Sequence, residues 1–84
     1  MQYTYPTRGT CAQLIDFEIN DGKLENVAFT GGCNGNLKAI GKLVEGADAR
    51  EIATLLRGNT CGRRPTSCAD QLALAIDQAL AREA

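Results

Sequence analysis

The residues best suited to chemistry lie in the stretch TCGRRPTSCAD, residues 60–70. It contains Cys61 and Cys68, two adjacent arginines and a proline, and Ser67 followed three residues later by Asp70 resembles a capping box ahead of an apolar-periodic run. We therefore expect Cys68 in the first turn of a helix, where unpaired N–H groups and the helix dipole favour a negatively charged sulfur. A cysteine at such a position is suited to bind a metal ion or to take part in thiol chemistry.

The four cysteines of the chain all fall at the ends of expected elements. Cys11 begins a strand, Cys33 precedes a helix, Cys61 lies in a loop and Cys68 begins a helix. Tetrahedral zinc needs four converging ligands, and positions at element ends leave the backbone free to supply them. The spacing differs from the usual pairs of cysteines about two to four residues apart. The residues alone therefore leave open a four-cysteine zinc site, an iron–sulfur cluster with the same ligands, and reduced, partly buried thiols without a cofactor. A redox pair is favoured less, because the chain has no Cys-x-x-Cys.

A second group of residues could bind a phosphate, as a nucleotide would present it. Arginines and the glycine-rich turn GGCNG before a helix could point charges and N–H groups at an anion. The group comprises Arg8, Arg63, Arg64, Gly32, Asn34 and Ser67. Loop arginines are more often solvated charges, and neither a dinucleotide fingerprint nor a phosphate loop is present.

Size and composition limit the function classes. Eighty-four residues make one small domain, and such a chain buries only about 60–65% of its unfolded surface. A net charge of −1 gives no general electrostatic case for nucleic acid or a membrane surface. No apolar run reaches the length of a membrane span, and no charged-then-apolar leader precedes Tyr3. We expect the cytoplasm, where thiols stay reduced.

Three strands are expected first, over residues 3–7, 11–20 and 23–30. In the second strand the alternation places five residues on a core face: Cys11, Gln13, Ile15, Phe17 and Ile19. In the third strand Leu24 falls on the face opposite Val27 and Phe29. A three-residue bulged turn with Gly22 in the left-handed region would bury both phenylalanines. It pairs Ile15 with Val27, Phe17 with Glu25, and Cys11 with Gly31.

Three helices are expected next. The first covers residues 36–44, the second follows an Asp48–Glu51 capping box and ends near Arg57, and the third covers residues 68–82. Their expected core residues are Leu37, Ile40, Leu43 and Val44, then Ala49, Ile52, Ala53, Leu55 and Leu56, then Leu72, Ala75, Ile76, Ala79 and Leu80. Leu74 lies opposite and could mark a small self-contact, as in a homodimer. The order predicts an α+β domain, a three-stranded antiparallel meander with three helices packed on one face.

At Thr66-Ser67-Cys68-Ala69-Asp70 the chain resembles the TSCPD domain family. It is most similar to a small stand-alone branch marked by four cysteines, and the resemblance covers essentially the whole chain, residues 1–84, with Ala69 where the namesake motif has proline. The family is similar to a C-terminal segment of vitamin-B12-dependent ribonucleotide reductases, and stand-alone members are sometimes labelled ribonucleoside-diphosphate reductase.

The resemblance implies a shared four-cysteine site and an accessory module that binds metal, a nucleotide or a reductase-like partner. A complete reductase needs a large barrel, a reducing cysteine pair and a substrate pocket, which 84 residues cannot enclose.

Overall fold

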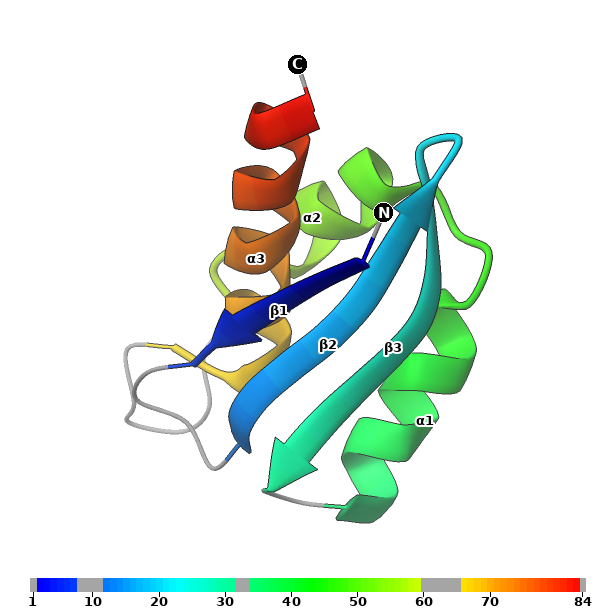
Figure 1. Ribbon diagram of the computed structural model, residues 1–84. Helices are drawn as coiled ribbons and strands as arrows, with labels where there is room; N and C mark the ends of the chain where they lie inside the picture. Colours follow the sequence, from blue (N-terminus) through cyan, green and yellow to red (C-terminus); the bar gives the residue numbers. More distant parts are fainter. Residues whose placement is uncertain (1, 8–11, 32–33, 60–65, 84) are drawn as a thin grey trace.

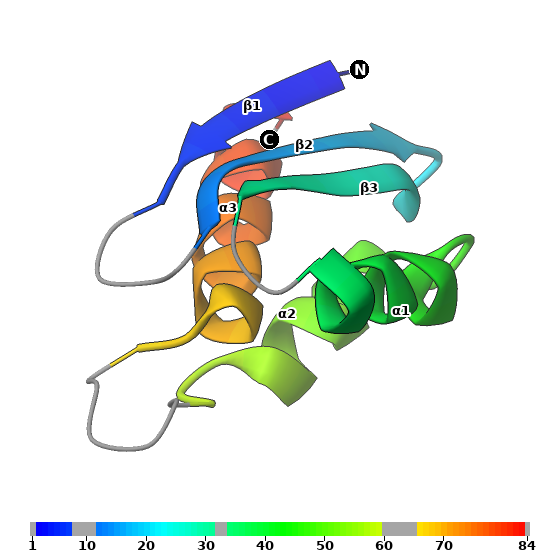
Figure 2. The ribbon, with the colours of Figure 1, turned by 90° about the horizontal axis from the view of Figure 1, so that it is seen from below.

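The computed structural model describes residues 2–7, 12–31, 34–59 and 66–83. Three antiparallel strands form one sheet in the order β1-β2-β3: β1 (Gln2–Pro6), β2 (Ala12–Asn20) and β3 (Lys23–Gly31). Three helices follow: α1 (Asn34–Val44), α2 (Ala49–Leu56) and α3 (Cys68–Glu83). They lie on one side of the sheet (Figures 1 and 2). The predicted α+β meander is confirmed.

The turn between β2 and β3 contains two residues. Asp21 and Gly22 have φ angles of 53° and 76°, and two positive values in succession are typical of a type I′ turn, which fits the right-handed twist of a hairpin. Ile19 therefore pairs with Leu24. The predicted three-residue turn is wrong, and Leu24, expected on the outer face, is fully buried.

The bulge that we expected in the turn lies instead inside β3, at Asn26. The pairing register of β2 with β3 shifts between Asp16 and Glu18, and Asn26 on the opposite strand has a φ of 53°. In a regular strand Leu24 and Phe29, an odd number of residues apart, would point to opposite faces, and the inserted residue brings both to the core side.

The predicted pairings change accordingly. Ile15 pairs with Phe29 rather than Val27, and Glu25 pairs with Glu18 rather than Phe17. Gly31 pairs with Ala12, and Cys11, its predicted partner, lies outside the described residues.

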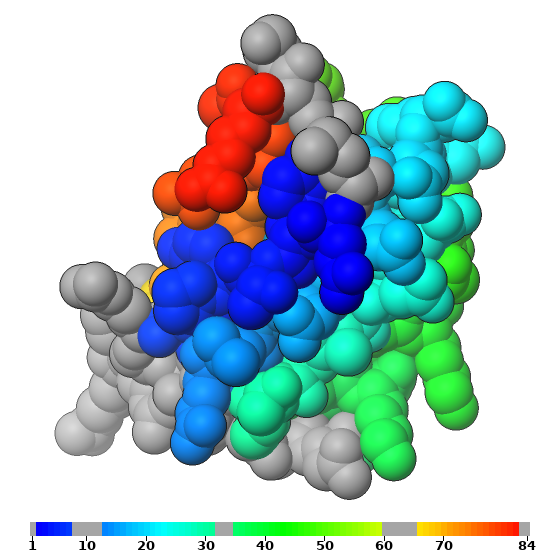
Figure 3. Space-filling model, in the orientation of Figure 1, coloured from blue at the N-terminus to red at the C-terminus, as the bar shows by residue number. Residues whose placement is uncertain are grey.

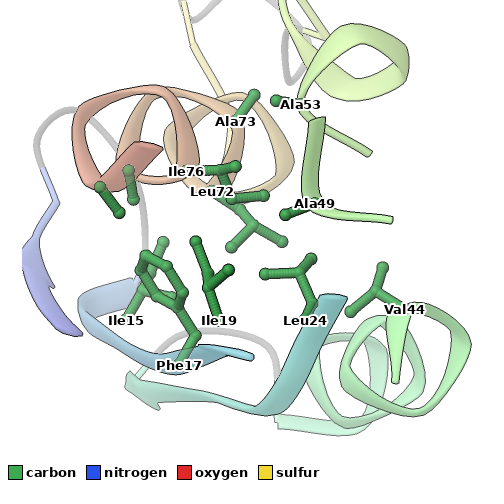
Figure 4. Close-up of a cluster of buried hydrophobic side chains, with 12 residues drawn as sticks. Ile15, Phe17, Ile19, Leu24, Val44, Ala49, Ala53, Leu72, Ala73 and Ile76 are labelled. Carbon is green, nitrogen blue, oxygen red and sulfur yellow. The ribbon is translucent and has the colours of Figure 1, made fainter. Parts of the chain in front are cut away.

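The core lies between β2 and the helices (Figure 4). Ile15, Phe17 and Ile19 project toward Leu72 and Ile76 of α3, all five at most 2% exposed. The ring of Tyr3 stacks on Phe17 with centroids 5.5 Å apart, so β1 contributes to the same cluster. The predicted core face of α3 is confirmed, with Leu80 partly buried and Leu74 exposed as expected.

Two predicted core residues are wrong. Leu43 is 82% exposed and Leu55 is 69% exposed. Each lies two residues after a position that faces the fold, Gly41 in α1 and Ala53 in α2, and two residues turn a helix by ~200°. Once Gly41 and Ala53 face inward, the leucines must face outward.

Backbone bonds join the α1–α2 connection to the hairpin. The Gly46 N–H donates to the Leu24 carbonyl at 2.7 Å, and the Leu24 N–H donates to the Ala47 carbonyl at 2.8 Å. The Ala49 N–H, in the first turn of α2, donates to the Gly22 carbonyl at 2.8 Å. The predicted cap is confirmed as well, since Asp48 Oδ1 accepts the Glu51 N–H at 2.9 Å.

The face of the sheet turned away from the helices is uncovered (Figure 3), and polar side chains interact across it. The Thr4 hydroxyl donates to Asp16 Oδ1 at 2.6 Å, and the Asn20 amide donates to Glu25 Oε1 at 2.7 Å. Within the described ranges, no helix has the length and apolar character needed to cross a bilayer.

Candidate functional site

The start of α3 is formed by the residues that the sequence singled out. Cys68 is the first helical residue and its side chain is partly exposed. The Ser67 hydroxyl accepts the Asp70 N–H at 3.1 Å, which is the predicted helix cap. The same hydroxyl donates to the backbone carbonyl of Asn59, so the cap also binds the segment that follows α2.

The carboxylate of Asp70 reaches outside its own helix. Oδ1 accepts the Gly58 N–H at 2.7 Å, and Oδ2 accepts the Thr66 hydroxyl. Gln71 completes the group by donating from Nε2 to Thr66 Oγ1 at 3.0 Å. A capping box would predict only local contacts for Asp70, and its bond to Gly58 joins it to the end of another helix.

We call this network the α3 clamp: Gly58, Asn59, Thr66, Ser67, Asp70 and Gln71. Ser67, Asp70 and Gln71 are each at most 9% exposed, so water competes little for their bonds. The clamp joins the end of α2 to the start of α3, on either side of residues 60–65. Three of the five motif positions, Thr66, Ser67 and Asp70, thus belong to the clamp, and Cys68 is left partly exposed between them.

A second contact joins the same two helices further out. The Arg57 guanidinium donates to both carboxylate oxygens of Asp77, the shortest distance being 2.7 Å. Both side chains are well exposed, at 52% and 40%, so this pair adds little to stability.

Most of the predicted site residues lie outside the described residues. This applies to three proposed metal ligands, Cys11, Cys33 and Cys61, and to four proposed phosphate ligands, Arg8, Gly32, Arg63 and Arg64. Of the rest, Asn34 begins α1, and the hydroxyl of Ser67 is engaged in the α3 clamp.

Described residues beside two of these cysteines lie at the same end of the molecule as Cys68. Ala12 directly follows Cys11 in sequence, and Gly31 directly precedes Gly32 and Cys33. Ala12 and Gly31 are Cα partners in the sheet. The start of β2, the end of β3 and the starts of α1 and α3 all lie at this end in both views (Figures 1 and 2).

Within the part of the chain that the structure describes, no three Cys, Asp or Glu side chains gather in a way that could hold a metal ion. Four-cysteine ligation therefore stays a prediction.

Comparison with known proteins gives one match. A family model described as the TSCPD domain matches residues 1–80. No curated protein and no solved structure matches the chain.

Proposed function

The chain belongs to the TSCPD domain family, which is associated with ribonucleotide reductases, and from this premise we propose that it is a small zinc-binding module accessory to ribonucleotide reduction in the cytoplasm. In the proposed site the thiolates of Cys11, Cys33, Cys61 and Cys68 bind one metal ion. In this proposal, catalysis belongs to a reductase-like partner.

The proposal rests on the positions at which the strands and helices next to the cysteines begin and end. The described residues beside Cys11 and Cys33 lie at the same end of the fold as Cys68, although these cysteines are far apart in sequence. The α3 clamp fixes the backbone on both sides of the segment that contains Cys61. A soft, all-sulfur donor set suits tetrahedral zinc, and the helix N-terminus at Cys68 offsets part of the negative charge of four thiolates.

The role of zinc in such a site is structural. A bound metal that the unfolded chain cannot hold adds its binding free energy to folding, which matters most in a domain with a small core. The metal would join the ends of the hairpin to the starts of two helices.

The experiment is elemental analysis of protein purified without added zinc, combined with a thiol titration under denaturing conditions. We expect one zinc per chain, lost in Cys68→Ser, whose melting temperature should fall to that of the chelator-treated wild type. Leu74→Ser, at an exposed position of the same helix, is the matched control and should keep its zinc. Metal-free protein whose melting temperature does not respond to added zinc would refute the proposal.

The same preparation distinguishes the alternatives. Iron with inorganic sulfide in place of zinc would indicate an iron–sulfur cluster on the same ligands. A Cys61–Cys68 disulfide that forms and reduces near the cytosolic potential would indicate thiol redox work. A rise in melting temperature with nucleotides, lost on replacing Arg63 and Arg64, would indicate the phosphate site.

A further inference from the structure

A groove of about 420 Å³ lies between β3 and α1. Its apolar lining includes Val27 and Phe29 of β3, both only partly buried, and Leu37 of α1. In the space-filling view β3 (teal) and α1 (green) lie side by side along one edge of the molecule (Figure 3). The volume is within the usual range of small-molecule sites, about 300–1,000 Å³.

Gly41 lines the groove where α1 approaches β3 closely. A Cβ at this position would lie 2.7 Å from the backbone oxygen of Val27, so the close approach of α1 to β3 requires glycine. The groove therefore lies beside a close contact between α1 and β3, and that contact fixes the distance between its two walls.

The groove is lined by two positively charged side chains. Lys38 and Lys42 are one turn apart on α1, and both are exposed. The ion pair found within the described ranges is the Arg57–Asp77 pair, so neither lysine has a carboxylate partner there. Glu45, the acidic residue of the lining, is engaged by the Asn26 N–H, which donates to its Oε1 at 2.9 Å.

We propose that this groove binds a small organic anion, with its apolar body against Val27, Phe29 and Leu37 and its anionic group between Lys38 and Lys42. Lysines at positions i and i+4 have Cβ atoms about 5–6 Å apart, so two flexible ammonium groups can reach one anion. The apolar floor of the groove buries the apolar part of such an anion, which a simple inorganic ion lacks. This site is independent of the proposed metal site, because it contains no cysteine.

The test uses 8-anilinonaphthalene-1-sulfonate, which combines an aromatic body with one sulfonate. Its fluorescence should rise saturably on addition of the full-length folded protein, and amide NMR shifts should change at residues 26–29 and 37–42. The double variant Lys38→Glu/Lys42→Glu should weaken binding about tenfold, as expected for two exposed charge contacts, and added salt should weaken wild-type binding. Lys23→Glu/Arg50→Glu makes the same change in net charge at exposed positions outside the groove lining and should leave the affinity unchanged.

Far-UV circular dichroism and melting temperatures show that each variant is folded, since this probe also binds loosened proteins. The proposal is overturned if the groove variant binds as tightly as the control variant, or if the amide shifts map to another surface. It is equally overturned if amides of the groove shift with protein concentration in the absence of probe, because the occupant would then be a second copy of the chain.

Discussion

The carboxylate of Asp70 offers the sharpest test of how α3 is anchored. Asp70→Ala removes the acceptor for the Gly58 N–H, at 2.7 Å, and for the Thr66 hydroxyl. Hydrogen bonds to a charged group contribute about 1.5–3 kcal/mol each, but Gly58 is exposed and water can replace its partner. We therefore expect a loss of about 2–3 kcal/mol in the free energy of unfolding. For a domain of this size that lowers the melting temperature by roughly 10–20 °C.

Two further variants make the test specific. Asp77→Ala also removes an α3 carboxylate that binds the end of α2, but in an exposed ion pair, so it should cost at most about 1 kcal/mol. Asp70→Asn keeps the shape and one acceptor oxygen, and the Thr66 hydroxyl can turn to accept from the new amide. Its loss should be smaller than that of Asp70→Ala.

The assay is urea unfolding followed by far-UV circular dichroism, because the chain contains no tryptophan. Equal losses in Asp70→Ala and Asp77→Ala would show that burial of the clamp adds nothing. A loss below about 0.5 kcal/mol in Asp70→Ala, the range of ordinary surface substitutions, would refute the whole argument.

Two glycine predictions use the same unfolding assay. Gly41→Ala should destabilise the protein, because its Cβ would lie 2.7 Å from the Val27 backbone oxygen, whereas Gly35→Ala, with nothing within 4 Å, should stabilise α1 by up to about 1 kcal/mol; the reverse order would contradict the described packing of α1. Gly22→Ala should cost about 1–2 kcal/mol because φ is 76°, whereas Asp21→Asn, which type I′ turns favour, should be neutral or stabilising; unchanged stability in Gly22→Ala would contradict the two-residue turn.

Local sequence signals predicted most of the elements. Alternation at Ile15, Phe17 and Ile19 marked β2, helical spacing at Leu72 and Ile76 marked α3, and the observed boundaries fall within two residues of those expected. These signals work because each depends on one strand or one helix alone.

What failed depends on contacts between elements. The turn sequence allows either a bulged or a two-residue loop, and the bulge lies at Asn26, where Glu45 of the distant α1 end accepts the displaced N–H. The exposure of Leu43 and Leu55 likewise follows from how α1 and α2 are rotated against their neighbours. Neither the position of the bulge nor the exposure of these leucines can be predicted from a local sequence pattern.

The candidate site divides in the same way. The position of Cys68 at a capped helix start could be predicted, because Ser67 and Asp70 are close to it in sequence. The bonds from Asp70 to Gly58 and from Ser67 to Asn59 could not, because they join residues that only the packing of α2 against α3 brings together.

The connection between α1 and α2 constrains how the sequence of this domain can change. Its bonds to Gly22 and Leu24 use main-chain atoms only, so most side chains there can be exchanged without loss of a bond. Gly46, with a φ of 77°, is the exception. An insertion or deletion of one residue, in contrast, would move the donors and acceptors of all three bonds away from their partners. The connection between α1 and α2 should therefore tolerate many amino-acid sequences but only one length.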